Sequence, residues 1–344
     1  MRNHDIVVIG ASAGGVRALQ ALIQTLPADL AAAVFIVMHT SPTTPSALAG
    51  ILGRSGRIVV SPAVDGERFR PGHVYTAQPG RHLLIENDRI VLSDGPRENR
   101  SRPSIDALFR SAATAYRGRV IGVVLTGYLD DGTAGLWAVK RGGGVTVVQD
   151  PDDAEHPCMP LNALRNFTVD HVVPIAGMAE LLVRLVAAPV TADDTAPLAW
   201  DEQRQPDHVF VCPDCDGPLQ RVQLGGDEPV HRFRCNVGHA HSLASLLSEH
   251  TEACEGALWA AVRSLEDEAV LTERAIEQGL ALSNGEAVEV LCSRAQECRS
   301  QATAIRDMLA RGQARRADAI AHAYAVTANA PVAPARETVT APGR

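Results

Sequence analysis

Buried strands that alternate with helices are the feature of this sequence that most narrows its possible folds. Residues 5–10, 33–39 and 119–127 are apolar runs, and they alternate with segments, such as residues 15–26, whose apolar residues recur at helical spacing. Strands that are apolar throughout are typical of parallel sheets that helices cover on both faces. We therefore predict an α/β fold for residues 1–187, a doubly wound and mostly parallel sheet with helices on both faces.

The composition changes after this first domain, which indicates further modules. Residues 188–207 are rich in Pro, Asp and Thr and are predicted to form a linker. Residues 208–249, which we name the Cys/His module, contain a cluster of Cys and His residues and predict a small zinc-ribbon-like fold. In residues 250–312 apolar positions recur three and four apart, a pattern that predicts an α-helical hairpin. Residues 313–344 are predicted to form a disordered tail.

Charge and hydropathy exclude several classes of function. The formal net charge of −8 argues against binding to nucleic acid or to an anionic membrane surface. No segment approaches the length of a membrane span, and the first residues lack the pattern of a signal peptide. The seven cysteines, an odd number, favour metal binding and free thiols over a disulfide framework. We therefore expect a cytoplasmic protein with no nucleic-acid partner and no membrane insertion.

A glycine-rich turn, VVIGASAGG at residues 7–15, joins the first predicted strand to the first predicted helix. Such a turn either cradles the phosphates of a nucleotide or presents Ser12 as a nucleophile. A dinucleotide site needs an acidic residue at the end of the second strand to bind the ribose, but that strand ends in His39. The sequence therefore disfavours a nucleotide-dependent oxidoreductase and favours acyl transfer.

Three strand ends bring the groups that acyl transfer needs to one edge of the predicted sheet. Ser12 follows the first strand, His39 ends the second, and Asp130 and Asp131 follow the strand at residues 119–127. A hydroxyl, an imidazole and a carboxylate can serve as nucleophile, base and orienting acid. Each residue also has a plain structural interpretation, because Ser and Asp cap helices and a His at a strand end is commonly only hydrogen-bonded. Spacing alone does not choose between these interpretations.

Several segments resemble the catalytic domain of the CheB family, the protein-glutamate methylesterases of chemotaxis. They are VVIGASAGG, FIVMHTSP, YTAQPGRHLLI, RPSIDALFRSAA, GVVLTGYLDDGTAGL and VQDPDDAEHPCMPLNAL, and they follow the family's order. The resemblance places the nucleophile on Ser12, the base on His39 and the orienting acid on Asp131 rather than Asp130. It implies a hydrolase that acts on glutamate γ-methyl esters of chemoreceptor-like proteins, that can also deamidate glutamine, and that needs no cofactor for catalysis.

The resemblance also implies roles for residues around this triad. The N–H groups of Ala13 and of the loop at Tyr128 would hold the oxyanion. Arg102 and Ser104 either line the groove for a receptor helix or form a loop and a helix cap. Met38 and Tyr128 depart from the family's usual Gln and Met, and the usual receiver domain does not precede the catalytic strand. The chain thus resembles a stand-alone subgroup with a C-terminal Cys/His module, for which a methyltransferase of the same pathway is a further expected partner.

The Cys/His module offers three thiols and an imidazole in the motifs CPDC and CNVGH, namely Cys212, Cys215, Cys235 and His239. This donor set suits one tetrahedral zinc ion, and a closed site of this kind is structural. We expect removal of the metal to unfold the module and to leave esterase activity largely intact; a metal-free remnant of the same small fold is the alternative.

The helical hairpin predicts either a dimer or a docking element for a signalling partner. An alternative function for the whole chain follows from these parts. In this alternative the chain has little catalytic activity and acts in signalling by binding partners through its zinc and helical segments.

Overall fold

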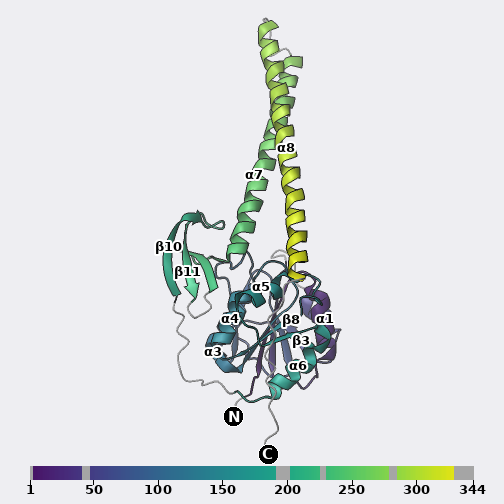
Figure 1. Cartoon of the computed structure of the whole chain (residues 1–344), viewed down its shortest axis with the longest axis vertical. Helices are drawn as coiled ribbons and strands as arrows, with labels where there is room; N and C mark the ends of the chain where they lie inside the picture. The colour runs from purple at the N-terminus through teal and green to yellow at the C-terminus, as the bar shows by residue number, and fades with distance from the viewer. Residues whose placement is uncertain (1–2, 41–46, 191–201, 225–229, 279–284, 329–344) are drawn as a thin grey trace, which may run out of the picture. The chain divides into compact units, whose positions relative to one another are not determined.

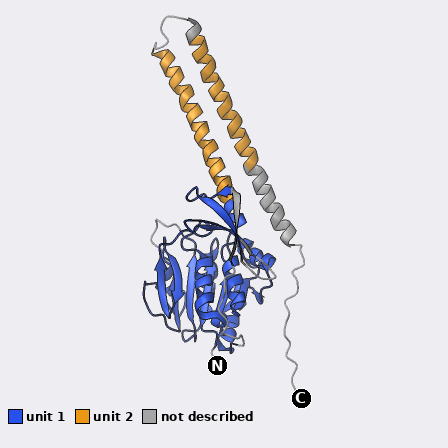
Figure 2. Cartoon of the chain, turned by 90° about the vertical axis from the view of Figure 1, so that its left-hand side faces the viewer, with its two compact units in different colours: residues 1–246, 334–344 blue, residues 247–333 orange. Residues whose placement is uncertain are grey.

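The computed structural model describes residues 3–40, 47–190, 202–224, 230–278 and 285–328 of the chain (Figure 1). The described residues form two compact units, one up to Leu246 and one from Leu247 (Figure 2). The first unit holds the predicted catalytic domain together with nearly all of the Cys/His module. The second unit holds the helical hairpin.

A parallel sheet forms the centre of the first unit. Within the described residues it has seven strands in the order β3-β4-β2-β1-β7-β8-β9, and all neighbours run parallel. The strands are β1 (Ile6–Ala11), β2 (Ala33–Met38), β3 (Val59–Pro62), β4 (His73–Thr76), β7 (Val120–Val124), β8 (Val145–Gln149) and β9 (His171–Val173). Strand β1 lies at the centre, where all six of its residues are buried. This confirms the predicted α/β fold.

Helices cover both faces of the sheet because alternate side chains of each strand point to opposite faces. In β1, Val7 and Ile9 belong to one apolar core and Val8 belongs to the other. The helices on the Val7 face are α1 (Gly15–Thr25), α2 (Leu48–Gly53) and α6 (Ile175–Ala187). Those on the Val8 face are α3 (Ile105–Tyr116), α4 (Thr133–Arg141) and α5 (Cys158–Asn166). The short elements α2, α5 and β9 were not predicted, since they span too few residues to show a period.

A hairpin that turns at Asp88 is formed by β5 (His82–Glu86) and β6 (Arg89–Ser93). Asp88 and its neighbour Asn87 adopt positive φ angles of 58° and 50°, which Asn and Asp tolerate better than most residues. The buried side chains of the hairpin join the core on the α3 face of the sheet. The loop that follows, residues 94–104, therefore begins close to that helix.

The Cys/His module forms a small antiparallel sheet in the order β10-β11-β12-β13. Its strands are β10 (Glu202–Val211), β11 (Pro218–Leu224), β12 (Val230–Cys235) and β13 (Ala240–His241). Strand β10 begins within the predicted linker, of which residues 191–201 lie outside the described residues. The module's small core includes Cys212, Leu219 and Phe233. So few apolar side chains bury little surface, and such a fold normally gains stability from a metal.

The second unit consists of α7 (Leu243–Glu277), of which the first residues belong to the first unit, and α8 (Gly285–Ala328). The two helices pack through a narrow seam that includes Ala269, Ala295 and Cys298, with flanking ion pairs such as Arg294–Glu268 and Arg299–Glu273. Helix α8 continues past residue 312, where we expected the hairpin to end. Its Ala-rich sequence favours a helix there, and residues 329–344 of the predicted tail lie outside the described residues.

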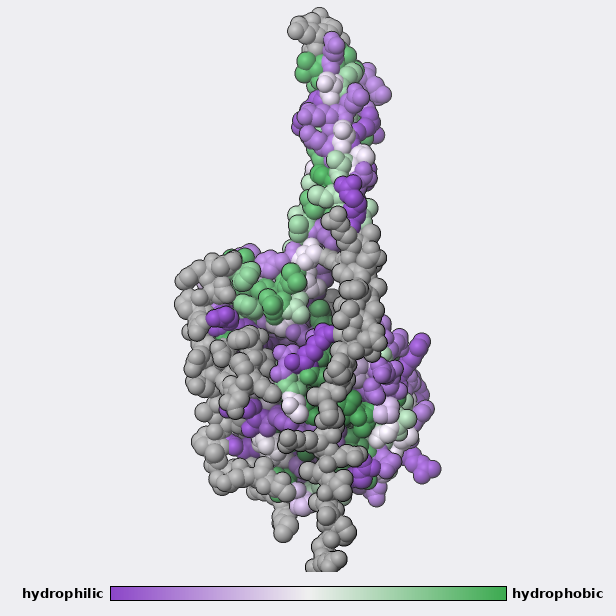
Figure 3. Space-filling model, viewed as in Figure 1, coloured by the Kyte–Doolittle hydropathy of each residue, from purple (hydrophilic) through white to green (hydrophobic). Residues whose placement is uncertain are grey.

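On the face of the helical hairpin seen in Figure 3, hydrophilic side chains alternate with apolar ones. Leu247, Leu271 and Val290 are the most exposed of these, at 67%, 64% and 63%. Scattered apolar residues of this kind are normal on a protein surface and do not by themselves mark an interface. Among the described residues, none of the helices combines the length and the apolar composition that crossing a membrane requires.

Candidate active site

Ser12 lies in the turn between β1 and α1, at the carboxyl end of the central strand. Its N–H donates a hydrogen bond to the Thr126 carbonyl oxygen at 3.0 Å. The Thr126 hydroxyl in turn donates to the carbonyl oxygen of Ala13 at 3.0 Å. Gly14, which precedes α1, has a φ of 74°, a conformation that favours glycine. The nucleophile turn is therefore held to the loop after β7 by two hydrogen bonds.

His39 follows β2 and faces Ser12 from the neighbouring strand end. Its Nδ1 atom lies 3.2 Å from Ser12 Oγ, and its Nε2 atom lies 2.7 Å from Asp131 Oδ2. A neutral imidazole with its proton on Nε2 donates to Asp131 and leaves Nδ1 free to accept the Ser12 hydroxyl hydrogen. The three side chains thus form one continuous chain of contacts, with the geometry that a nucleophile, a base and an orienting acid require.

Asp131 is buried and its carboxylate is fully engaged. It accepts hydrogen bonds from the Asn99 amide, the Ser104 hydroxyl and the Ile105 N–H, as well as from His39. Burial raises the pKa of Asp131, but the hydrogen bonds from His39, Asn99 and Ile105 outweigh burial and bring the pKa below its usual range. Asp131 therefore stays ionised and can stabilise a positive charge on His39.

Asp130 points elsewhere. Its carboxylate accepts a hydrogen bond of 2.7 Å from the hydroxyl of Ser242, and burial raises the pKa of this carboxyl group. Leu129, which precedes the pair, has a φ of 60°, and the two successive aspartates meet different partners. The acid that faces His39 is thus Asp131, the one that the resemblance implied.

A hollow of about 280 Å³ opens over the Ser12 and His39 side chains. Tyr128 and Leu129 form one wall, and Asn99, Arg100 and Ser101 form another, while Ser245 of the Cys/His module also lines it. The Tyr128 side chain is 52% exposed and its ring centre lies 4.4 Å from that of His156. Within the described part of the chain, the N–H groups of Ala13 and Tyr128 have no hydrogen-bond partner.

The family model described as CheB methylesterase matches residues 7–182, about half of the chain. The chain belongs to the CheB methylesterase family. Membership makes it a hydrolase of carboxylic esters and confirms the resemblance found in the sequence. The match covers the region that contains Ser12, His39 and Asp131 and leaves out the Cys/His module and the helical hairpin.

Two relatives and one solved structure illustrate the similarity. A protein of Leptospira interrogans (strain Fiocruz L1-130), provisionally named protein-glutamate methylesterase/protein-glutamine glutaminase, is 41% identical over 184 residues, which are 53% of this chain and 95% of the relative. Protein-glutamate methylesterase/protein-glutamine glutaminase 1 of Geobacter metallireducens is 39% identical over 52% of this chain, and the match spans 50% of that relative. The crystal structure of the Thermotoga maritima CheB methylesterase catalytic domain matches with 34% identity and a TM-score of 0.52, over 54% of this chain and all of that domain.

The two residues predicted to line a receptor groove of this CheB chain take different places. Arg102 lines a smaller hollow beside His39, but its guanidinium group donates to the carbonyl oxygens of Asp94 and Gly95, which commits it to the loop. Ser104 has no exposed surface, so it cannot contact a substrate. It directly precedes helix α3, as the helix-cap alternative has it, although its hydroxyl donates to Asp131 rather than to the helix.

Sequence reasoning missed several residues that hold the CheB site in place. The Asn99 amide nitrogen donates to both Asp131 and Asp106, at 2.9 and 2.7 Å. His82 donates through Nε2 to the Pro96 carbonyl oxygen and accepts the Ser104 N–H at Nδ1, and burial lowers its pKa, which favours this neutral ring. The segments that contain these residues match the family, but no spacing in the sequence indicates which groups they meet.

Met159 and Gly127 form a close contact beneath the nucleophile. A Cβ atom on Gly127 would lie 2.1 Å from Met159 Sδ and 2.8 Å from Ser12 Cβ. The N–H of Gly127 donates to the His156 carbonyl oxygen, and its own carbonyl oxygen accepts the Met159 N–H. The loop that carries Tyr128 is therefore packed directly against the Ser12 turn, and only glycine fits at position 127.

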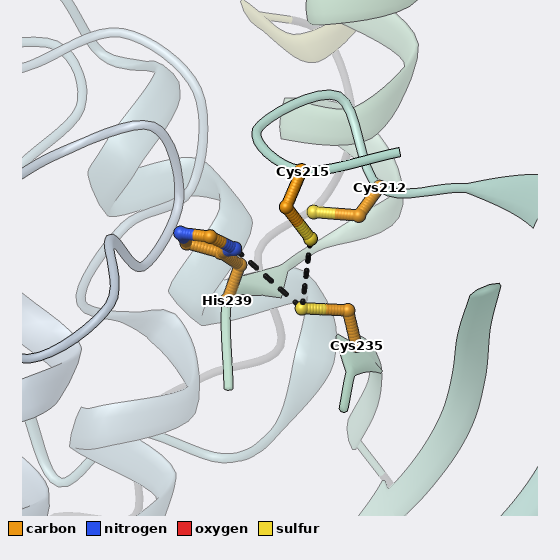
Figure 4. Close-up of side chains that lie close together, drawn as sticks. All are labelled: Cys212, Cys215, Cys235 and His239. Carbon is orange, nitrogen blue, oxygen red and sulfur yellow. Dashed lines mark hydrogen bonds between the residues drawn. The ribbon is translucent and has the colours of Figure 1, made fainter. Parts of the chain in front are cut away.

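The four predicted metal ligands come together in the Cys/His module (Figure 4). Cys215 Sγ lies 3.6 Å from Cys235 Sγ, which lies 3.5 Å from His239 Nδ1. In a tetrahedral zinc site with Zn–S bonds of about 2.3 Å, the sulfur atoms are about 3.8 Å apart, so this donor set fits the ion. His241 Nε2 lies 3.6 Å from Cys212 Sγ and forms a second candidate group with Asp214.

Proposed function

We propose that this chain hydrolyses the γ-methyl esters of glutamate residues in methylated chemoreceptor-like proteins and deamidates glutamine residues there. Both reactions begin with attack of a hydroxyl group on a side-chain γ-carbonyl carbon. The names of the relatives mention both activities. The observation that carries the proposal is the chain of contacts from Ser12 through His39 to Asp131 at the floor of an open hollow.

In the proposed mechanism Ser12 Oγ bonds to the γ-carbonyl carbon while its proton moves to His39 Nδ1. The carbonyl electron pair shifts to the oxygen, which accepts hydrogen bonds from the N–H groups of Ala13 and Tyr128. The C–OCH₃ bond then breaks, and His39 returns the proton to the leaving oxygen, so that methanol departs. Asp131 remains ionised and stabilises the imidazolium ion while it exists.

Water completes the reaction by the same steps in reverse order. A water molecule gives a proton to His39 Nδ1 as its oxygen bonds to the acyl carbon. The C–Oγ bond breaks, and Ser12 recovers the proton, which leaves a free glutamate side chain. With a glutamine substrate the leaving group is ammonia and the steps are otherwise unchanged.

We also propose that Cys212, Cys215, Cys235 and His239 hold one structural zinc ion, which would cross-link the two short loops of the module. None of the seven cysteines, all of which lie in the described residues, forms a disulfide, which supports a cytoplasmic location. Because the ester must be formed before it is hydrolysed, a methyltransferase that acts on the same receptor is the expected pathway partner. A dimer through the helical hairpin stays a prediction, which sedimentation of the intact chain would check.

Methanol release from a carboxyl-methylated receptor fragment tests the proposed activity. Ser12→Ala should lower the rate on the order of 10³–10⁶-fold, because the triad groups act as a unit. Ser248→Ala, a change on helix α7 outside the residues 7–182 that the family model matches, should leave the rate unaltered. Release that survives Ser12→Ala would refute the nucleophile, and no release by the wild-type chain from any methylated receptor would refute the substrate.

A further inference from the structure

One segment of the Cys/His module runs along the loop that supports the triad acid. The N–H of Ala240 donates to the Arg97 carbonyl oxygen, and the N–H of Asn99 donates to the Ala240 carbonyl oxygen at 2.7 Å. Ala240 and Glu98 also pair as a short parallel bridge. The module and the loop therefore share backbone hydrogen bonds, as two parts of one folded unit do.

Asn99 extends this contact to the triad. Its amide nitrogen donates to the carboxylates of Asp131 and Asp106, and its amide oxygen accepts the N–H of Ser242 at 3.0 Å. If the amide turned over, its oxygen would face two carboxylates and the Ser242 N–H would lose its partner. The N–H of Ser242 therefore fixes the orientation in which Asn99 donates to Asp131.

Arg232 of strand β12 brings a positive charge to the same cluster. Its side chain is 8% exposed, and its Nη2 atom lies 3.2 Å from Asp106 Oδ2 and 3.3 Å from Glu98 Oε2. Asp106 is fully buried and also accepts the N–H groups of Gly132 and Gly135, which follow directly after Asp131 at the start of α4. Arg232 thus stabilises a carboxylate that in turn holds the backbone around Asp131.

The charge state of Asp106 matters because Asn99 donates to it. Burial raises the pKa of Asp106 to about 6, Arg232 opposes this effect, and the negative charges of Asp131 and Glu98 add to it. A proton on Asp106 Oδ2 would point at the Asn99 amide and compete with its hydrogen bond. Arg232 favours the ionised form, which keeps the Asn99 amide between the two carboxylates.

We propose that the Cys/His module is a working part of the active site, in which Arg232 and the Ser242 N–H position Asp131 through Asp106 and Asn99. The inference rests on the proposed function, since it concerns the same triad. It replaces the expectation that metal removal spares the esterase activity. His239 directly precedes the segment that binds Asn99, so loss of an ion from the module would release that segment.

The test compares Arg232→Met and Arg232→Lys in the intact chain with Arg221→Met, the same change on the neighbouring strand β11 at an exposed position. Labelling of Ser12 by a fluorophosphonate, followed by mass spectrometry, measures activation of the nucleophile without requiring the natural ester. Methanol release is measured in parallel. Circular dichroism and thermal unfolding report whether each variant is folded.

We expect the fluorophosphonate to label Ser12 roughly 10- to 100-fold more slowly in Arg232→Met than in the wild type, the cost of a small misplacement of catalytic groups. In the methanol-release assay this variant should have a lower kcat with little change in KM. The loss should be greater at pH 6 than at pH 8. Without the Arg232 cation the pKa of Asp106 rises further, and higher pH restores its ionised form. Arg232→Lys should recover part of the rate, and Arg221→Met should match the wild type.

Removal of the metal from the wild-type chain is a second, independent test of the inference. Treatment of the wild-type chain with a strong zinc chelator should slow labelling of Ser12, and it should speed hydrogen exchange at the Asn99 N–H because this group donates to Ala240. Unchanged exchange and unchanged labelling after the metal has been removed would overturn the role of the segment.

Two results separate the inference from the proposed function. Labelling of folded Arg232→Met at the wild-type rate, or a loss that is equal at every pH and follows the unfolded fraction, would overturn the inference while the proposed function stands. Normal labelling of the wild-type chain with no methanol released from any methylated receptor would overturn the proposed substrate and leave the positioning of Asp131 to be judged by the labelling rates.

Discussion

Replacement of Glu98 by Gln should destabilise the first unit by an amount that depends on pH. Burial raises the pKa of Glu98, but the charges of Arg110 and Arg232 outweigh burial and lower it from 4.5 to about 2. Each tenfold change in proton affinity corresponds to about 1.4 kcal/mol, so this drop stabilises the folded state by about 3 kcal/mol at pH 7. The side chain is buried, so solvent screening does not reduce this figure much.

The sign of the pH dependence follows from the lowered pKa. A carboxyl group that releases its proton more easily in the folded state contributes its full stability above the unfolded pKa of about 4.5, and the contribution is lost as the pH falls toward 2. At pH 3 about 1.4 kcal/mol should remain. Glu98→Gln removes the charge but keeps the size of the side chain, so its deficit should shrink in the same way.

Urea unfolding of the wild type and of Glu98→Gln at pH 7 and pH 3 measures this difference. Glu86→Gln, at an exposed position in β5, is the matched control and should change stability by less than about 0.5 kcal/mol. A deficit for Glu98→Gln below about 1 kcal/mol at pH 7, or one that is equally large at pH 3, would show that the two arginines do not stabilise a buried carboxylate there.

Two further predictions concern the aspartate pair and the metal. Asp131→Asn should lower methanol release on the order of 10³–10⁴-fold, because the amide cannot hold His39 in the required tautomer. Asp130→Asn should lower it much less, and equal losses in steady-state assays would contradict the assignment of the acid. Elemental analysis of the purified chain should find about one zinc per molecule, and Cys235→Ser should reduce this content while Cys254→Ser, an exposed cysteine of α7, should not; a metal-free wild-type protein prepared without chelators would exclude the site.

The strands and the three groups at the sheet edge are predictable from local patterns. Apolar runs identify buried strands, and parallel strands place their carboxyl ends at one edge, so Ser12 and His39 had to lie close together once the sheet formed. The choice between Asp130 and Asp131 needed the family resemblance, because both residues follow the same strand and no local pattern shows which carboxylate meets His39.

The groups that support Asp131 could not be predicted from the sequence, for a different reason. Asn99 and Ser104 of the loop at residues 94–104 and Arg232 of strand β12 meet Asp131 and Asp106 from two separate segments of the chain. Each is a polar residue in a loop or a short strand, where nothing in the local pattern distinguishes a buried partner from a solvated one. Their roles depend on tertiary packing, which also makes Ser104 a buried donor to Asp131 rather than a residue of the groove.

The position of β1 has a consequence for how the chain matures. The strand precedes the other strands of its sheet in the chain but lies at the centre, paired on one side with β2 and on the other with β7, whose first residue, Val120, comes more than a hundred residues later. On the ribosome, the nucleophile turn therefore emerges long before the strand that completes its surroundings. Contacts between such distant segments form slowly, so a nascent chain carries Ser12 for much of its synthesis as an ordinary hydroxyl group, unable to act on receptors around it.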